Sequence, residues 1–200
     1  MGLDFFRERR IRAGLSGGKR QEMRLLIASD IHGSLRYCRE LLRAYDREQA
    51  ERMLLLGDIL YHGPRNDLPE EYAPKGVIEA LNERKNDILC VRGNCDTEVD
   101  QMVLAFPLMA DYALVCADGR RMYATHGHVY HPDHLPPLRE GDILLYGHTH
   151  IPAWETRGGI LCLNPGSVSI PKGDSRRGYM VFDSGVFEWK TLDGEIYFKL

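Results

Sequence analysis

The hydrophobic positions between residues 23 and 91 fall into short unbroken runs separated by amphipathic stretches. Three apolar runs are RLLIAS (24–29), MLLL (53–56) and ILCV (88–91). Such runs are typical of strands buried on both faces of a sheet. Residues 34–48 and 75–85 carry apolar side chains at helical spacing, whereas 61–74 is rich in Pro, Asn and Gly and predicts an irregular surface loop. This half therefore predicts strands alternating with helices.

The second half of the chain changes to short β-prone runs separated by turns. These runs are residues 112–117, 121–125, 143–146, 160–163, 179–183 and 186–190. Turn pairs such as Asp118-Gly119 and Gly158-Gly159 separate several of them. Strands alternating with helices and then following one another predict sheets packed against helical layers. Without an internal repeat or linker, residues 23–200 are interpreted as one α/β domain.

Polar residues follow five of the predicted strands at the point where each run ends. They are Asp30, His32, Asp58, Asn94, His126, His148 and His150. Ligands of open α/β sheets bind at the carboxyl ends of the strands. We therefore expect these side chains to meet at one site.

The composition is that of an ordinary globular protein, with 44% hydrophobic and 28% charged residues among 200. No apolar run approaches the roughly 18 residues of a membrane span. The net charge is −3, and residues 23–200 hold 20 Lys/Arg and 26 Asp/Glu, a balance of −6. An acidic body argues against extended nucleic acid as a partner, because that binding depends on basic contacts to phosphates. A small phosphorylated substrate stays compatible with it, since bound metal ions meet its charge locally.

The cysteines and the N-terminus bear on where the protein works. Five cysteines, an odd number without a CxxC pair, indicate neither a disulfide framework nor a zinc ribbon. Together with the lack of a signal peptide, this predicts a cytoplasmic protein. Residues 1–22 carry six Lys/Arg and three acids and are interpreted as an appendage outside the domain. A membrane-surface anchor is the less favoured alternative for that segment.

The chemistry of the polar residues points to metal ions. Asp30 and His32 are two apart, as are His148 and His150, and residues two apart on an extended chain face the same side. The whole set offers carboxylate, imidazole and amide ligands with no thiolate, which suits Mn, Fe, Zn, Co or Ni. Seven ligands are too many for one tetrahedral ion. They suit two ions about 3.5–4 Å apart that share a bridging carboxylate.

The ordered motifs resemble those of a known superfamily. They are DIHG (30–33), LGDIL (56–60), RGNCD (92–96), THGH (125–128) and YGHTH (146–150). In this order they resemble the calcineurin-like metallophosphoesterase superfamily. HGPRNDLPEEYAP (62–74), RGNCDTEVDQM (92–102) and NPGSVSIPKG (164–173) narrow the likeness to the bacterial YfcE-type phosphodiesterases. This resemblance covers essentially all of the chain from Met23 onward.

The resemblance implies a four-layer α/β/β/α sandwich and a dinuclear phosphodiesterase. It assigns Asp30, His32 and His150 to the first metal, Asn94, His126 and His148 to the second, and Asp58 to the bridge. The cofactors are then two divalent transition-metal ions, with Mn expected and Zn, Fe, Ni or Co as alternatives. A metal-bridging hydroxide would attack the phosphorus of a small phosphodiester. The sequence does not decide the oligomeric state, and a homo-oligomer, a dimer or a tetramer, is the candidate.

The chain departs from the superfamily pattern at one position and leaves the substrate contacts open. Cys95 stands where the superfamily usually has a histidine, a candidate general acid. A thiol with a pKa near about 8.5 can donate a proton but carries no positive charge toward a monoester dianion. We therefore expect little phosphomonoesterase activity. The residues expected to take part in the reaction are Asp58, Asn94, Cys95 and His128, and those expected to contact substrate are His62 and Arg65.

Three alternatives remain at the level of sequence. A non-catalytic scaffold of the Vps29 type would have lost part of the ligand set, whereas all seven positions are filled here. A phosphomonoesterase or protein phosphatase would usually carry Gly-Asp-x-x-Asp-Arg-Gly and Gly-Asn-His-Glu, whereas this chain reads GDILYHG and GNCD. A nuclease would need a basic track, which the acidic body does not offer.

Overall fold

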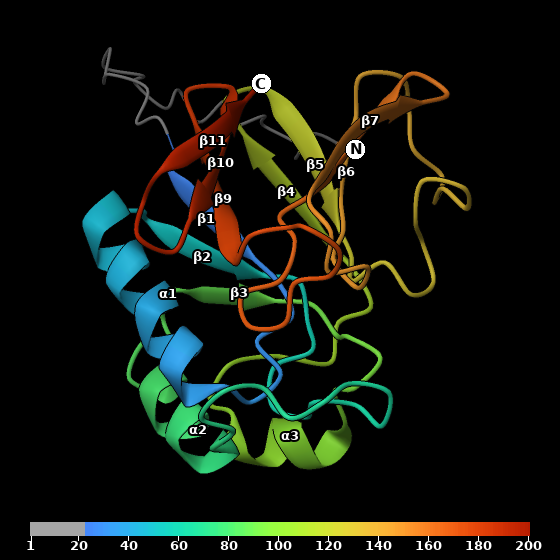
Figure 1. Ribbon diagram of the computed structural model, residues 1–200. Coiled ribbons are helices and arrows are strands. Elements are labelled where there is room, and N and C mark those ends of the chain that lie inside the picture. Colours follow the sequence, from blue (N-terminus) through green and yellow to red (C-terminus); the bar gives the residue numbers. More distant parts are fainter. Residues whose placement is uncertain (1–22) are drawn as a thin grey trace, which may run out of the picture.

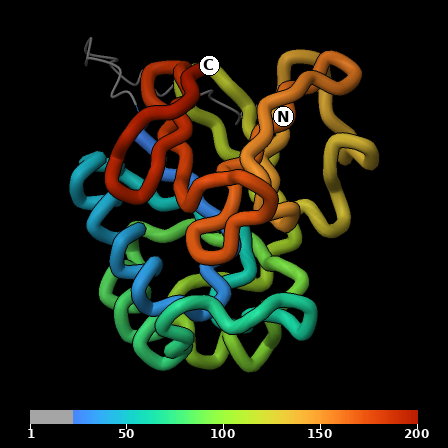
Figure 2. The backbone as a smooth tube through the Cα atoms, in the orientation of Figure 1, coloured from blue at the N-terminus to red at the C-terminus, as the bar shows by residue number. Residues whose placement is uncertain are grey.

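The computed structural model describes residues 23–200, which fold into two β-sheets with helices against one of them (Figure 1). The prediction about residues 1–22 lies outside this range. The strands of the first sheet are β1 (Leu25–Ala28), β2 (Arg52–Leu55), β3 (Ile88–Cys90), β9 (Gly178–Asp183), β10 (Val186–Thr191) and β11 (Ile196–Lys199). They lie in the order β11-β10-β9-β1-β2-β3. Strands β1, β2 and β3 are parallel, and β9 runs antiparallel to β1, so both ends of the described chain meet in one sheet (Figure 2).

The second sheet is built from the middle of the chain. Its strands are β4 (Ala113–Ala117), β5 (Arg120–Ala124), β6 (Ile143–Leu145), β7 (Ala153–Arg157) and β8 (Ile160–Asn164). They lie in the order β4-β5-β6-β8-β7, with β5, β6 and β8 parallel. All strands predicted from apolar runs are confirmed, with small shifts at their ends.

Two predicted helices cover the outer face of the first sheet. Helix α1 (Leu35–Glu48) is preceded by the N-cap residue Ser34, whose side chain accepts a hydrogen bond from the backbone N–H of Tyr37, and is followed by the C-cap residue Gln49 in the left-handed region. Helix α2 (Pro74–Asn82) begins with a proline, which suits a first helical turn. Both confirm the helical spacing read from the sequence.

The core is divided into layers by the alternation of side chains along each strand. Leu26 packs with the helices, whereas its neighbour Ile27 packs between the two sheets. On the outer face of the second sheet, Leu144 and Tyr146 pack against Leu135 and Leu138 of the loop between β5 and β6. The α/β sandwich is confirmed, and among the described residues this loop covers the face opposite to the helices.

Three elements were not predicted, and each of them is short and largely exposed. Helix α3 (Glu98–Val103) has six residues and no buried side chain, and it is fixed by a capping box between Thr97 and Asp100. Strands β7 and β11 are edge strands and are largely exposed. Within residues 23–200, no helix is both long enough and apolar enough to cross a membrane.

Candidate metal centre

The seven predicted ligands lie on loops at the carboxyl ends of β1, β2, β3, β5 and β6. Parallel strands open toward the same edge, so the two sheets deliver these loops to one place. Three ligand atoms of Asp30, His32 and His150 lie within 4.8 Å of one another, as do those of Asp58, His126 and His148. The structure therefore brings the predicted residues into two adjoining clusters.

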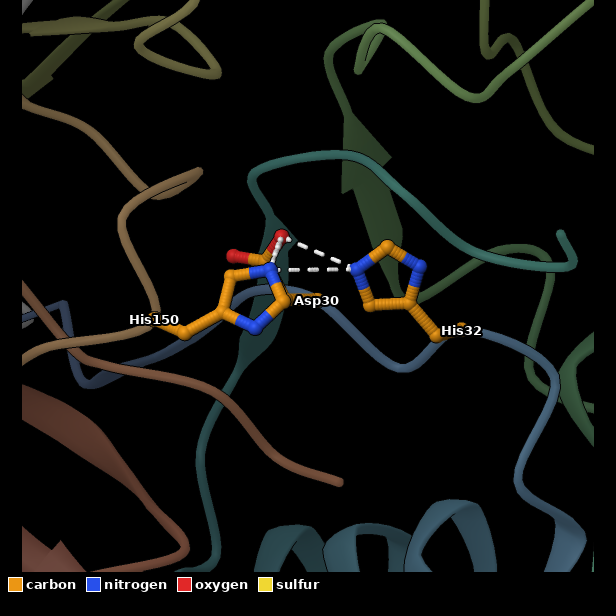
Figure 3. Close-up of side chains that lie close together, drawn as sticks. All are labelled: Asp30, His32 and His150. Carbon is orange, nitrogen blue, oxygen red and sulfur yellow. Dashed lines mark hydrogen bonds and ion pairs between the residues drawn. The ribbon is translucent and has the colours of Figure 1, made fainter. Parts of the chain in front are cut away.

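The first cluster is formed by Asp30, His32 and His150 (Figure 3). Oδ1 of Asp30 lies 3.4 Å from Nε2 of His32 and 3.2 Å from Nε2 of His150. The two imidazole Nε2 atoms face each other at 3.2 Å. All three side chains are buried, so little water reaches these atoms.

The second cluster is formed by Asn94, His126 and His148, and Asp58 lies between the two. Nε2 of His126 is 3.1 Å from Oδ1 of Asn94. Oδ2 of Asp58 is 3.4 Å from Nε2 of His126 and 3.6 Å from Nε2 of His32. One carboxylate oxygen thus faces both clusters, which is the geometry expected of a bridging ligand.

The hydrogen bonds around the clusters show that a metal fits them. In His32, His126 and His150 the Nδ1 atom lies 2.7 Å from a backbone carbonyl oxygen, of Tyr61, Leu56 and Ile170 respectively. A carbonyl only accepts, so Nδ1 carries the hydrogen and donates it. In the neutral rings of His32 and His150 the Nε2 lone pairs then point at each other, and that of His126 points at Oδ1 of Asn94. Oδ1 of Asp30 is also buried without a hydrogen-bond partner among the described residues. A bound cation would accept the electron pairs of the Nε2 atoms and of Oδ1 of Asp30, so each of these buried atoms would gain a partner.

The ligand loops hold an uncommon backbone conformation. Asp30, His32, Asp58, His148 and His150 all have φ between 50° and 65°, in the left-handed region. The expectation that Asp30 and His32 share a face because the chain is extended is therefore wrong, and the same holds for His148 and His150. These side chains converge because left-handed turns redirect them. Non-glycine residues in this region cost energy and cluster at functional sites.

Two glycines of the motifs are required by the close approach of neighbouring loops. A Cβ on Gly93 would lie 2.1 Å from Oδ1 of Asp58, and one on Gly147 would lie 2.0 Å from Oγ of Ser29. Neither position accepts a side chain unless a neighbouring loop moves. The glycines in GNCD and GHTH therefore allow the ligand loops to pack together.

Buried polar side chains hold these loops in place. The carboxylate of Asp96 accepts hydrogen bonds from the backbone N–H groups of Asp58, Ile59 and Gly93 at 2.7–2.9 Å. The hydroxyls of Ser167 and Ser169 donate to the carbonyl oxygen of Asp30 at 2.9 and 3.1 Å.

The loop that carries His148 and His150 is held in the same way. The amide of Asn164 donates to the carbonyl oxygen of Gly147 at 2.9 Å and to Oγ1 of Thr149 at 3.0 Å. These two hydrogen bonds tie the GHTH loop to the end of β8.

The buried charges shift the pKa values of the ligands in the metal-free protein. Burial opposes the charge of Asp30, but the neighbouring imidazoles of His150 and His32 outweigh it and hold its pKa well below the usual range. Burial also opposes the charge of His126, yet Asp58 and Asp30 raise its pKa to about 9. Burial and the neighbouring His126 lower the pKa of His148 to about 4. The carboxylates thus draw positive charge into the site, and a metal must displace a proton from His126 to bind there.

Cys95 lies beside the predicted ligands, and its thiol differs from the sequence-based expectation in its pKa. Its Sγ lies within 4.8 Å of ligand atoms of His32 and Asp58. Burial and the nearby Asp58 raise the pKa of the thiol to about 12, above the value assumed from sequence. A thiol that stays protonated at neutral pH is a weak metal ligand and a weak acid.

The remaining predicted residues are divided between the site and its surroundings. His128 lies beside the second cluster, with its ring 5.4 Å from that of His126 and its buried Nδ1 without a hydrogen-bond partner among the described residues. Arg65 lines a cleft of about 370 Å³ together with Asp58, Asn94 and His148. His62 does not line this cleft; its ring packs edge-on against Tyr61 and Tyr72.

The cleft also contains residues that sequence reasoning missed. Lys172 lines it on the side of His150, and Asn66 lines it next to Arg65. Lys172 belongs to the NPGSVSIPKG segment and is more than twenty residues beyond His150, the nearest predicted ligand in sequence. Only the fold reveals that this lysine lines the same cleft as the predicted ligands.

Comparison with known proteins supports the resemblance that was inferred from the sequence motifs. The family model of the calcineurin-like phosphoesterase superfamily domain matches residues 23–185. The chain is 50% identical over 173 residues to Phosphodiesterase YfcE of Escherichia coli, an alignment that covers 86% of this chain and 94% of YfcE.

Solved structures agree with the sequence comparison. The structure of YfcE, described as a phosphoesterase from E. coli, superimposes with a TM-score of 0.86 at 47% identity and covers 89% of this chain and 98% of that one. Vps29 of Chaetomium thermophilum is similar with a TM-score of 0.60 at 15% identity, covering 89% of this chain and 97% of that one. The second likeness concerns the fold alone.

Proposed function

The chain belongs to the calcineurin-like phosphoesterase superfamily, and from this premise we propose that it is a metal-dependent phosphodiesterase acting on small phosphodiesters. The observation that carries the proposal is the position of Asp58 between two clusters of nitrogen and oxygen ligands. Both clusters contribute to a cleft large enough for a small substrate. The ions we propose are two divalent transition metals, with manganese as the activator.

The proposed roles follow from the position of each side chain. Asp30, His32 and His150 would hold one ion, Asn94, His126 and His148 the other, and Asp58 both. Bound there, such ions supply an acidified water and polarise phosphoryl oxygens. Arg65 and Lys172 line the cleft and are proposed to attract the anionic substrate. His128 lies beside the second cluster and is proposed to contact the phosphoryl group.

A preference for diesters over monoesters is supported by the chemistry of Cys95. A monoester is a dianion at neutral pH, whereas a diester carries one negative charge. The thiol of Cys95 is neutral and holds its proton, since its pKa is raised to about 12. It therefore offers no cation to the second negative charge of a monoester.

Two other functions fit the geometry less well. In three histidines a hydrogen bond from Nδ1 to a backbone carbonyl oxygen turns Nε2 toward the buried carboxylates. A non-catalytic scaffold would not need this arrangement. A phosphomonoesterase would benefit from a cationic imidazole at the position of Cys95, which this chain lacks.

The proposed function predicts manganese-dependent hydrolysis of an aryl diester. Purified protein with added Mn²⁺ should release 4-nitrophenol from bis(4-nitrophenyl) phosphate much faster than from 4-nitrophenyl phosphate. The two substrates share the leaving group, so their ratio measures the preference for diesters. Equal rates on both substrates, or no turnover with any divalent ion, would contradict the proposal.

Exchanging Cys95 for histidine should change this selectivity. Cys95→His places an imidazole beside Asp58 and Asn94, and general acid-base assistance typically contributes about 10²- to 10⁴-fold. The rate on 4-nitrophenyl phosphate should rise relative to bis(4-nitrophenyl) phosphate.

Cys95→Ala is the matched control, because it removes the thiol without adding an imidazole. It should leave diester hydrolysis largely intact, since 4-nitrophenolate leaves without a proton. An unchanged ratio in Cys95→His, with both metals bound, would show that the thiol only fills space.

The finer assignments are also proposals. We propose that residues 23–200 form the catalytic domain, that the protein works in the cytoplasm, and that neither extended nucleic acid nor a membrane is a partner. The acidic balance of residues 23–200 supports the exclusion of nucleic acid. We further propose a homo-oligomer, a dimer or a tetramer, which light scattering of the purified chain would test.

A further inference from the structure

A second groove lies beside the cleft and is lined mainly by apolar side chains. It has a volume of about 420 Å³ and is bordered by the loop between β2 and α2 and by α2 and α3. Figure 1 shows this loop running close to both helices. The walls of the groove include Tyr61, Tyr72, Ile78, Val99 and Val103. Val99 is 68% exposed and Val103 43%, so α3 presents apolar side chains that the fold leaves uncovered.

The groove is connected to the metal centre through two of its wall residues. The carbonyl oxygen of Tyr61 accepts the hydrogen bond from Nδ1 of the predicted ligand His32 at 2.7 Å, while the side chain of Tyr61 lines the groove. Cys95 lines both the cleft and the groove, and its backbone N–H donates to Oδ1 of Asp58 at 2.8 Å. The groove therefore begins one residue away from the predicted ligands.

The charged residues that line the cleft and the groove indicate that the two bind chemically different groups. The cleft contains Arg65 and Lys172, which suit a phosphate anion. Among the described residues that line the groove there is no lysine or arginine, and its one acid, Asp100, accepts hydrogen bonds from the backbone and side chain of Thr97. An anionic group would meet no cation there. An uncharged apolar group would cover the exposed valines and the ring of Tyr61.

We propose that this groove binds one apolar, uncharged organic arm of the phosphodiester while the phosphate lies in the cleft. The inference rests on the proposed function and adds to it the class of substrate: diesters with at least one aryl or alkyl arm. Cys95 stands between the two parts of the bound substrate. The loop between β2 and α2 supplies walls to both, with Tyr61 toward the groove and Arg65 toward the cleft.

The test measures binding and does not depend on turnover. Monomethyl phenylphosphonate and monomethyl methylphosphonate are monoanions that resemble a diester and differ only in one arm. Calorimetry on the Mn²⁺-loaded protein should show about tenfold tighter binding of the phenyl compound, the lower end for one apolar contact. In Val99→Asn/Val103→Asn the ratio should fall to near one.

Met102→Asn is the matched control, because Met102 lies on the same helix, is 83% exposed and does not line the groove. It should keep the wild-type ratio, and thermal melting should show that both variants stay folded. The proposal is overturned if the wild-type protein binds the two phosphonates equally well, if the double variant keeps the wild-type ratio of affinities, or if neither phosphonate binds.

The proposed enzymatic function is tested separately. If the protein binds the phenyl compound more tightly but does not hydrolyse bis(4-nitrophenyl) phosphate, the proposed enzyme is overturned and the groove assignment stands.

Discussion

Replacing Asp58 by asparagine is expected to lower kcat/KM for bis(4-nitrophenyl) phosphate by about a thousandfold or more. Oδ2 of Asp58 faces His126 at 3.4 Å and His32 at 3.6 Å, so this carboxylate serves both clusters. The amide lacks the negative charge that offsets two cations, and metal ions supply several kcal/mol of transition-state stabilisation. Each 1.36 kcal/mol corresponds to about a factor of ten in rate. The loss should exceed that of any change confined to one cluster.

Steady-state kinetics and metal analysis of the same samples would check this expectation. Asp133→Asn is a matched control, since Asp133 is exposed on the loop between β5 and β6 and the same charge is removed. The control should keep full activity and metal content. If Asp58→Asn retains most of its turnover while His126→Ala abolishes it, Asp58 is not the bridge.

Removing the metals should abolish activity and lower thermal stability. The protein is expected to contain close to two transition-metal ions per chain, and dialysis against a chelator should leave only background hydrolysis. A ligand present at about 100 times its Kd stabilises by about 2.7 kcal/mol. For a chain of this size that corresponds to a loss of about 5–10 °C in Tm on removal. Added Mn²⁺ should restore both properties.

The pH dependence of metal binding gives an independent check. The pKa of His126 in the metal-free protein is raised to about 9, so below that pH a proton must leave before Nε2 can bind a metal. Metal affinity should therefore fall as the pH decreases from 9 toward 6.

The number of bound metal ions tests the dinuclear site directly. One tightly held zinc per chain, with no gain in activity on adding Mn²⁺, would contradict the dinuclear site.

The sequence by itself determined the architecture and the identity of the predicted ligands. Apolar runs such as RLLIAS and ILCV predict buried strands because burial on both faces of a sheet requires unbroken hydrophobic residues. Whether a side chain can bind a metal ion depends on its residue type, so carboxylate, imidazole and amide ligands can be identified from the sequence alone. Polar residues at several strand ends predict a shared site because parallel strands open toward one edge. The short helix α3 and the edge strands β7 and β11 escaped prediction because they are short and largely exposed, so burial fixes few of their positions.

Only the tertiary structure decided how the predicted site works in detail. His32 and His150 are 118 residues apart in sequence, yet their Nε2 atoms lie 3.2 Å apart. The left-handed turns that aim them, the position of Asp58 between the clusters, and the place of Lys172 in the cleft all depend on loops from different strands. The raised pKa of Cys95 likewise comes from burial beside Asp58. Local sequence patterns report the chemistry of each residue, whereas distance, burial and charge between remote residues arise only when the two sheets pack.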